Sequence, residues 1–228
     1  MIIDEGVRGR TVLLAGGTSA AGRASARALT AAGAHVVVVG SNRQRLARLA
    51  AEMPDLAIER CDLTAADEVD ALRDRVHSAR GGVDGILHLV GGWRGGGGLA
   101  GQSDDDFAFL LRSLTALRHV SRAFDADLRA SDAGRLAIVS STAVERPLAG
   151  GANYAAVKAA SEAWVRAVAQ GYTKHARDAG RSATAAAVIF RVTSLEGLED
   201  ALAASVVALW DDDATAWNDV VIDIEPPG

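Results

Sequence analysis

The chain has 228 residues, of which 49% are hydrophobic and only 4% aromatic, and its formal net charge is −5 at pH 7. This length fits one domain with a full core, and a negative charge without any basic cluster argues against a nucleic-acid partner. The single cysteine, Cys61, excludes an internal disulfide, and the five histidines lack ligand spacing, so we expect no metal site. The start, Met1–Glu5, lacks the charged region of a signal peptide, and no apolar run reaches the roughly 18 residues of a membrane span. We therefore expect a cytoplasmic protein without a membrane partner.

The first part of the chain alternates short apolar runs with amphipathic patterns of helical period. We expect strands at 10–15, 36–39, 57–61 and 85–90, separated by helices at 23–32, 43–52 and 65–79. The resulting β-α-β-α-β-α-β order calls for a parallel, doubly wound sheet with right-handed crossovers.

A glycine-dense segment, Gly91–Gly98, follows the fourth expected strand, where doubly wound folds bind ligands. Ser103 and the acidic residues after it then mark a helix start. We expect helices at 103–129, 153–179 and 198–209, and strands at 134–140, 183–192 and 220–224. Because no repeat or linker interrupts this pattern, we expect residues 1–228 to form one α/β domain of about seven strands.

The run from Ala15 to Gly22 lies between an expected strand and an expected helix, the context that a nucleotide-binding glycine loop requires. Gly16 would allow a tight turn, and Gly22 would let helix and strand approach closely. Free amides at the helix start favour a pyrophosphate. A plain strand-to-helix connection is the alternative for this loop taken alone.

Tyr154 and Lys158 lie four positions apart, so on a helix they share one face. A phenol with a pKa of about 10 is a poor proton donor near neutral pH, but an ammonium one turn away lowers that pKa. Ser141 could supply a hydroxyl to the same oxygen that Tyr154 addresses. The alternative is an ordinary solvated helix face, because many helices carry such a pair by chance.

Five features in this order resemble the short-chain dehydrogenase/reductases. They are the loop at 16–22, Cys61-Asp62-Leu63, Gly91, Ser141, and the Tyr154-to-Lys158 motif. The resemblance covers the chain from about Thr11 to Ile224. It implies a Rossmann fold and hydride transfer between a nicotinamide cofactor and the carbonyl or alcohol carbon of a small molecule. It also implies pairing through the two long helices, so we expect a homodimer or homotetramer.

The resemblance assigns roles to individual residues. Tyr154 would be the general acid/base, Lys158 would lower its pKa and hold the nicotinamide ribose, and Ser141 would position the substrate oxygen, with Ser140 as the fallback. The implied cofactor-binding residues are Gly16, Thr18, Ser19, Ala20, Ala21, Gly22, Ser41, Asn42, Arg43, Asp62, Leu63, Val90, Gly91, Tyr154 and Lys158. Among them, Asp62 would meet the adenine amino group, although it could instead cap the end of its strand.

The choice between NADP and NAD depends on the residues after the second strand. NAD-binding members usually place a carboxylate there to accept from the ribose hydroxyls. This chain has Gly40-Ser41-Asn42-Arg43 instead, so nothing repels a 2′-phosphate. We expect NADP, with NAD possible, since Arg43 could simply be the first solvated residue of a helix.

The chain departs from the family pattern at four places. Ala20 replaces the middle glycine of the loop, and the small Ala21 follows it. A methyl group here leaves less space for a pyrophosphate to approach the backbone. His88 precedes Gly91 where the family carries asparagines that brace the sheet, and it is either a structural residue or an active-site group. The family's helix asparagine, which holds a relay water, aligns with Ser113, which could hold that water instead. The usual Pro-Gly after the sixth strand is replaced by residues 190–193.

Two alternative functions stay open. The run Val90–Trp93 and the short tail resemble the dihydropteridine reductase branch, which would act on a flat heterocycle on which Trp93 could stack. That branch typically lacks the serine kept here as Ser141, and Trp93 could equally pack back on the protein. The second alternative is a dinucleotide-binding protein without turnover, suggested by the altered loop.

Overall fold

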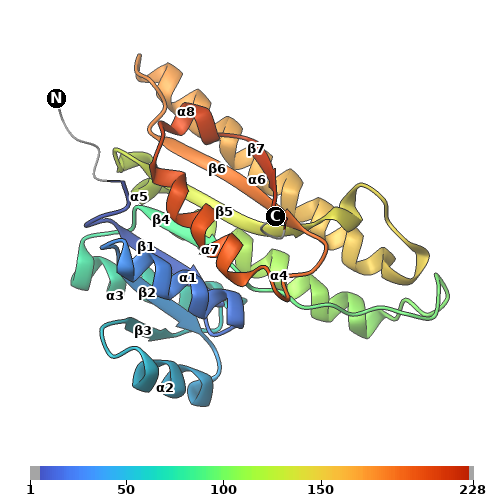
Figure 1. Cartoon of the computed structure of the whole chain (residues 1–228). Coiled ribbons are helices and arrows are strands. Elements are labelled where there is room, and N and C mark those ends of the chain that lie inside the picture. The colour runs from blue at the N-terminus through green and yellow to red at the C-terminus, as the bar shows by residue number, and fades with distance from the viewer. Residues whose placement is uncertain (1–5, 226–228) are drawn as a thin grey trace.

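The computed structural model describes residues 6–225, which form a seven-stranded parallel sheet in the order β3-β2-β1-β4-β5-β6-β7, covered by helices (Figure 1). The strands are β1 (Thr11–Ala15), β2 (His35–Gly40), β3 (Ala57–Arg60), β4 (Gly85–His88), β5 (Gly134–Ser141), β6 (Ala185–Val192) and β7 (Val220–Asp223). The helices are α1 (Ala20–Ala31), α2 (Arg43–Glu52), α3 (Ala66–Arg80), α4 (Asp104–Ala123), α5 (Asp125–Ala130), α6 (Ala152–Asp178), α7 (Glu199–Val207) and α8 (Ala214–Trp217). Three short 3₁₀ turns are η1 (Thr142–Val144), η2 (Ala149–Gly151) and η3 (Ala208–Trp210). The expected doubly wound Rossmann fold is confirmed.

The central strands are buried on both faces because helices pack on both sides of the sheet. Successive side chains of a strand point to opposite faces. Leu14 of β1 therefore belongs to the core shared with Leu29 of α1 and Leu202 of α7, whereas Leu13 belongs to the core shared with Leu117 of α4. Each fully buried leucine contributes roughly 1.5–3 kcal/mol, which explains why these strands are almost purely apolar in sequence.

The strand order reverses between β1 and β4, and this position is the topological switch point of the sheet. The loops after β1 and β4 meet there. Gly16 has φ +80°, and a Cβ at this residue would lie 2.9 Å from the backbone nitrogen of Val90. The tight turn expected at Gly16 is present, and glycine is required for both its conformation and its close backbone contact.

Some element boundaries differ from the sequence-based expectations. β4 ends at His88 rather than at residue 90, and the long helix expected over 103–129 is divided at Phe124 into α4 and α5. Phe124 has ψ 8° and is fully buried, with its ring in edge-to-face contact with His77 of α3. The break thus gives an aromatic side chain a place in the core. The unexpected helix α8 has four residues, too few for a readable period.

Other expectations concern partners and location. None of the helices within residues 6–225 is long and apolar enough to cross a bilayer. In the same residues, no three or more His, Cys, Asp or Glu side chains are grouped so that they could hold a metal ion. Met1–Glu5, on which the expectation about a signal peptide was based, lies outside the described residues. Phe107 and Phe109 of α4 are partly exposed, and the pairing of two chains through this helix stays a prediction.

Gly22→Ala is expected to destabilise the protein. An ideal Cβ at Gly22 would lie 2.3 Å from the carbonyl oxygen of Gly17, a backbone atom that cannot rotate away. We expect a loss of roughly 1–3 kcal/mol in the free energy of unfolding, measured by urea denaturation. The matched control is Gly171→Ala within α6, where no neighbouring heavy atom lies within 4 Å of the added Cβ. That variant should gain about 0.5–1 kcal/mol, and an unchanged stability of the Gly22 variant would contradict the tight loop packing.

Candidate active site

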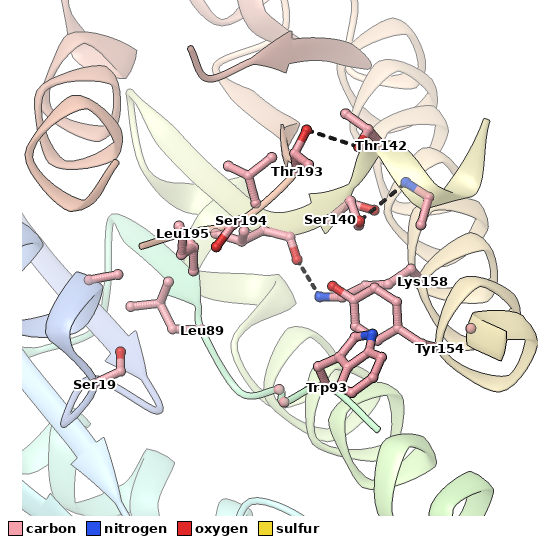
Figure 2. Close-up of a pocket in the computed structure, with 18 of the residues that line it drawn as sticks. Ser19, Leu89, Trp93, Ser140, Thr142, Tyr154, Lys158, Thr193, Ser194 and Leu195 are labelled. Atoms are coloured by element: carbon pink, nitrogen blue, oxygen red, sulfur yellow. Dashed lines mark hydrogen bonds between the residues drawn. The ribbon is translucent and has the colours of Figure 1, made fainter. Parts of the chain in front are cut away.

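A cavity of about 1030 Å³ lies at the carboxyl ends of β1, β4, β5 and β6 (Figure 2). Its walls come from the loop after β1, the glycine-rich segment after β4, the end of β5 with η1, the start of α6, and the segment after β6. This is the edge at which doubly wound sheets bind ligands. Of the residues selected from the sequence, the cavity is lined by Ser19, Ala20, Ala21, His88, Val90, Gly91, Trp93, Ser140, Ser141, Tyr154 and Lys158.

The three expected catalytic residues converge on this cavity. Ser141 is the last residue of β5, and its hydroxyl accepts from the amide of Ala143 over 3.2 Å while it also lowers the pKa of the Tyr154 phenol. Tyr154 lies in the first turn of α6 and Lys158 lies one turn later, with Nζ 5.7 Å from the Tyr154 ring centroid. The Lys158 ammonium donates to the carbonyl of Val139 over 2.6 Å, a contact that ties α6 to β5 (Figure 2).

The electrostatics of the pair differ from the expectation. Burial raises the pKa of Tyr154, and the hydrogen bond with Ser141 offsets only part of that increase. We expected Lys158 to lower this pKa, but desolvation is the larger effect and the ammonium is directed toward the Val139 carbonyl. Burial also lowers the pKa of Lys158 from 10.5 to about 8, while Glu162 acts in the opposite direction. At neutral pH the phenol is therefore protonated and can act as a proton donor.

A buried ionic network lies directly behind these residues. Ser140 donates to Glu162 over 2.7 Å, and Arg191 of β6 holds both carboxylate oxygens of Glu162 at 2.9 and 2.7 Å. Arg191 also pairs with Glu145 in the loop after β5. Ser140 is buried and committed to this network, which favours Ser141 over Ser140 as the hydroxyl that faces a ligand.

The structure does not bring Ser113 into the cavity, contrary to the role expected from the resemblance. Its hydroxyl donates to the carbonyl of Leu110 within α4, and its own carbonyl is hydrogen-bonded to Nε2 of His88 at 3.1 Å. Burial lowers the pKa of His88 to about 3, with a further contribution from Lys158, so the ring is neutral. The His88 side chain thus braces β4 against α4, the structural role kept open in the sequence analysis, and it also lines the cavity.

The glycine loop presents the start of α1 to the cavity. Ser19 is the N-cap of this helix, and its hydroxyl accepts from the amide of Gly22 over 3.1 Å. Arg23 donates to the carbonyl of Thr18, which closes the loop on itself. The exposed Ala20 and the neighbouring Ala21 line the cavity with methyl groups only. The loop therefore offers backbone amides rather than side-chain groups.

The residues expected around an adenosine lie outside the cavity lining. Asp62 accepts from both the amide and the hydroxyl of Thr64, at 3.0 and 2.7 Å, and lies 3.5 Å from Arg112. Asp62 therefore caps the turn after its strand, which is the alternative role that the sequence analysis left open. Leu63 is buried, and its carbonyl bonds to His119. Asn42 caps α2 by accepting from the amide of Arg45.

Sequence reasoning missed one cation at this end of the sheet. Arg60 is the last residue of β3 and pairs in register with Gly40, and its guanidinium donates to the carbonyl of Ser41 over 3.4 Å. It therefore lies beside the segment that carries Arg43. Only the strand register could have revealed this neighbour. A separate hollow of about 510 Å³ is lined by three further arginines, Arg23, Arg45 and Arg48, together with Thr18, Ser19 and Ala20 of the glycine loop.

Comparison with known proteins agrees with this geometry. A sequence model of the family described as short chain dehydrogenase matches residues 10–177. The chain belongs to this family. It is 32% identical over 164 residues to Nodulation protein G of Rhizobium meliloti (strain 1021), a match that covers 71% of this chain and 66% of that protein. The resemblance found in the sequence is confirmed, whereas the dihydropteridine reductase branch is not.

Solved structures share the fold over nearly the whole chain. A metagenomic short-chain oxidoreductase in complex with NADP has a TM-score of 0.84 and 22% identity, over 97% of this chain and 99% of that one. A short chain dehydrogenase from Salmonella enterica serovar Typhi has a TM-score of 0.83 and 21% identity, over 96% and 97% of the two chains. At such identities the likeness concerns the fold.

Lys158→Met is expected to change how stability depends on pH. The folded chain holds Lys158 with a pKa of about 8 against an ordinary 10.5, so between these values the unfolded chain binds more protons. Raising the pH through this window therefore stabilises the folded wild type, and the variant lacks this gain. We expect wild type to gain roughly 1–3 kcal/mol over the variant between about pH 7.5 and 10, measured by urea denaturation. A difference in stability that stays constant with pH would contradict the lowered pKa.

Proposed function

We propose that this chain is an NADP(H)-dependent oxidoreductase that interconverts a carbonyl and an alcohol, with Tyr154 as general acid/base. The observation that carries the proposal is the convergence of Ser141, Tyr154 and Lys158 on one cavity at the switch-point edge of the sheet. A solvated helix face, the alternative considered for this pair, does not account for Tyr154 lining the same cavity as Ser141 or for a lysine held by the Val139 carbonyl.

The residues at the glycine loop fit a dinucleotide. The first amides of α1 have no intrahelical partner, and the Ser19 hydroxyl satisfies only that of Gly22. A Cβ at Gly16 would press on Val90, so the backbone itself forms the floor under a ligand. Gly91 lies beside Lys158, with 3.9 Å between an added Cβ and Nζ. When bound at this edge, the nicotinamide supplies or accepts the hydride.

The chain's own residues would handle the proton. In the reductive direction the neutral phenol of Tyr154 gives its proton to the substrate oxygen, and the Ser141 hydroxyl donates to the same oxygen. The resulting phenolate is stabilised by the nearby Lys158 ammonium. Leu148, Leu195 and the exposed Trp93 form apolar walls of the cavity, which favours a substrate with an apolar body.

The preference for NADP rests on charge. The segment Gly40–Arg43 carries no carboxylate, and the Arg60 guanidinium lies against the Ser41 carbonyl, so Arg60 and Arg43 would be available to a 2′-phosphate bound at this segment. A structural relative of the same fold binds NADP, as its description states. NAD is the alternative if neither arginine contacts the ribose.

Tyr154→Phe is the direct test of the proposed chemistry. With a panel of carbonyl substrates, NADPH oxidation should fall by about 10²–10⁴-fold, while NADPH affinity, followed by nicotinamide fluorescence, stays unchanged. Ser141→Ala should lower the rate by about 10²-fold, and the control Ser205→Ala, whose hydroxyl bonds to the Ala201 carbonyl within α7, should retain most of it.

The outcomes separate the alternatives. Little loss in the Ser141 variant, with turnover of a quinonoid or other flat ring, would favour a pteridine-type reductase. Tight NADPH binding by a wild-type protein that turns over none of the carbonyls would favour a dinucleotide-binding protein without catalysis.

Arg60→Ala and Arg43→Ala test the cofactor preference. Each variant should weaken NADPH binding about tenfold or more, because a charge-assisted hydrogen bond to phosphate is lost, and should leave NADH binding unchanged. Arg73→Ala is a suitable control, since this residue pairs with Asp70 and Asp74 on α3. A wild type that binds NADH as tightly as NADPH would refute the assignment.

A further inference from the structure

We infer that Gln102 is a positioning residue that clamps the glycine-rich segment 91–101 onto the first turn of the helix that carries Tyr154. The inference rests on the proposed function in so far as it concerns catalysis. Gln102 lies between the glycine-rich segment and the N-cap of α4, outside every motif that the family resemblance supplied.

The Gln102 side chain joins two loops that are distant in sequence. Its Nε2 donates to the carbonyls of Gly150 at 3.0 Å and Gly96 at 3.1 Å, with a longer contact to Gly98 at 3.3 Å. Its Oε1 accepts from the amide of Asn153 at 3.1 Å. The two amide hydrogens thus bond in two directions, one within the glycine-rich segment and one across to η2.

The bond to Asn153 satisfies the start of α6. The first amides of a helix have no intrahelical acceptor and need a cap. The N-cap of α6 is Gly151, which has no side chain to fill this role. The Gln102 carbonyl supplies the cap from a distant part of the chain, at the residue directly before Tyr154.

Backbone packing brings the same two loops together. The amide of Gly96 donates to the Gly150 carbonyl over 2.7 Å, and a Cβ at Gly95 would lie 2.4 Å from that oxygen and 3.1 Å from the Trp93 ring. The Trp93 indole therefore packs against Gly95, at the place where the glycine-rich segment contacts Gly150 and where Gln102 holds the two loops together. Figure 2 shows Trp93 and Tyr154 at the same end of the cavity, whose lining includes both.

A glutamine is required for this arrangement. Three carbonyl oxygens face Nε2 and one amide faces Oε1, so the site needs a donor and an acceptor on one planar group. Glutamate keeps the acceptor and loses the donor, and methionine has neither in useful strength. A segment this rich in glycine also has high conformational entropy when it is free, so its order depends on such contacts.

The experiment compares Gln102→Met and Gln102→Glu with wild type, and uses Gln170→Met as the control on an exposed position of α6. We expect Gln102→Met to lower kcat/KM for a carbonyl substrate about tenfold, mainly through KM, with NADPH affinity unchanged. Gln102→Glu should share the KM effect. Unchanged kinetics in both Gln102 variants of an active enzyme would overturn the positioning role.

Amide hydrogen exchange gives a readout that does not need turnover. Gln102→Met should speed exchange in residues 95–101 and at Asn153, whereas Gln102→Glu should speed it in 95–101 only, because its acceptor for Asn153 remains. The Gln170 control should match wild type. If exchange in both regions is unchanged, the clamp itself is refuted. If exchange becomes faster but neither wild type nor any variant turns over a carbonyl, the proposed function fails and the clamp stands.

Discussion

The buried carboxylate of Glu162 is the constraint on which the candidate site depends. It is only 4% exposed, and a charge at that depth is tolerated only when it is neutralised and fully hydrogen-bonded. Arg191 and Ser140 supply these contacts, which lock α6 against β5 and β6 in one register. Lys158 lies one turn before Glu162 on the same helix, so fixing the carboxylate also fixes the lysine. Removing one partner of such a pair costs roughly 3–5 kcal/mol, because the other charge stays buried.

One side of the cavity is the rigid wall formed by β5 and α6, and the other side is the glycine-rich segment after β4, which has little intrinsic order. β5 and α6 carry Ser141, Tyr154 and Lys158 on regular elements, whereas the segment after β4 is mostly glycine. The role proposed for Tyr154 needs both walls, because the phenol must hold its position and the substrate must enter. Gln102 connects the two walls, since it caps α6 and orders the glycine-rich segment with one amide group.

The departures from the family pattern have local physical explanations. His88 stands where the family braces the sheet with asparagine, and its neutral ring makes one such contact to the Ser113 carbonyl. Ser113 is the residue that aligns with the family's relay asparagine, and its backbone carbonyl is occupied by this hydrogen bond to His88. Ala20 adds a methyl group on the exposed side of the loop. The close backbone contacts of the loop are made by Gly16, Gly17 and Gly22, so the methyl group does not disturb them.

The sequence by itself determined the fold class, the order of the seven strands along the chain, the glycine loop, and the choice of Ser141, Tyr154 and Lys158. The fold class and the strand order follow from local periodicity, which a sequence records directly, whereas the glycine loop and the three residues were selected because their order resembles the short-chain dehydrogenase/reductase motifs. Only the tertiary structure revealed the contacts of Arg60, Gln102 and Glu162, because strand register and loop-to-loop contacts join residues far apart in the chain. It also reversed the expected shift of the Tyr154 pKa, since desolvation depends on what surrounds a group in space and leaves no mark on its neighbours in sequence.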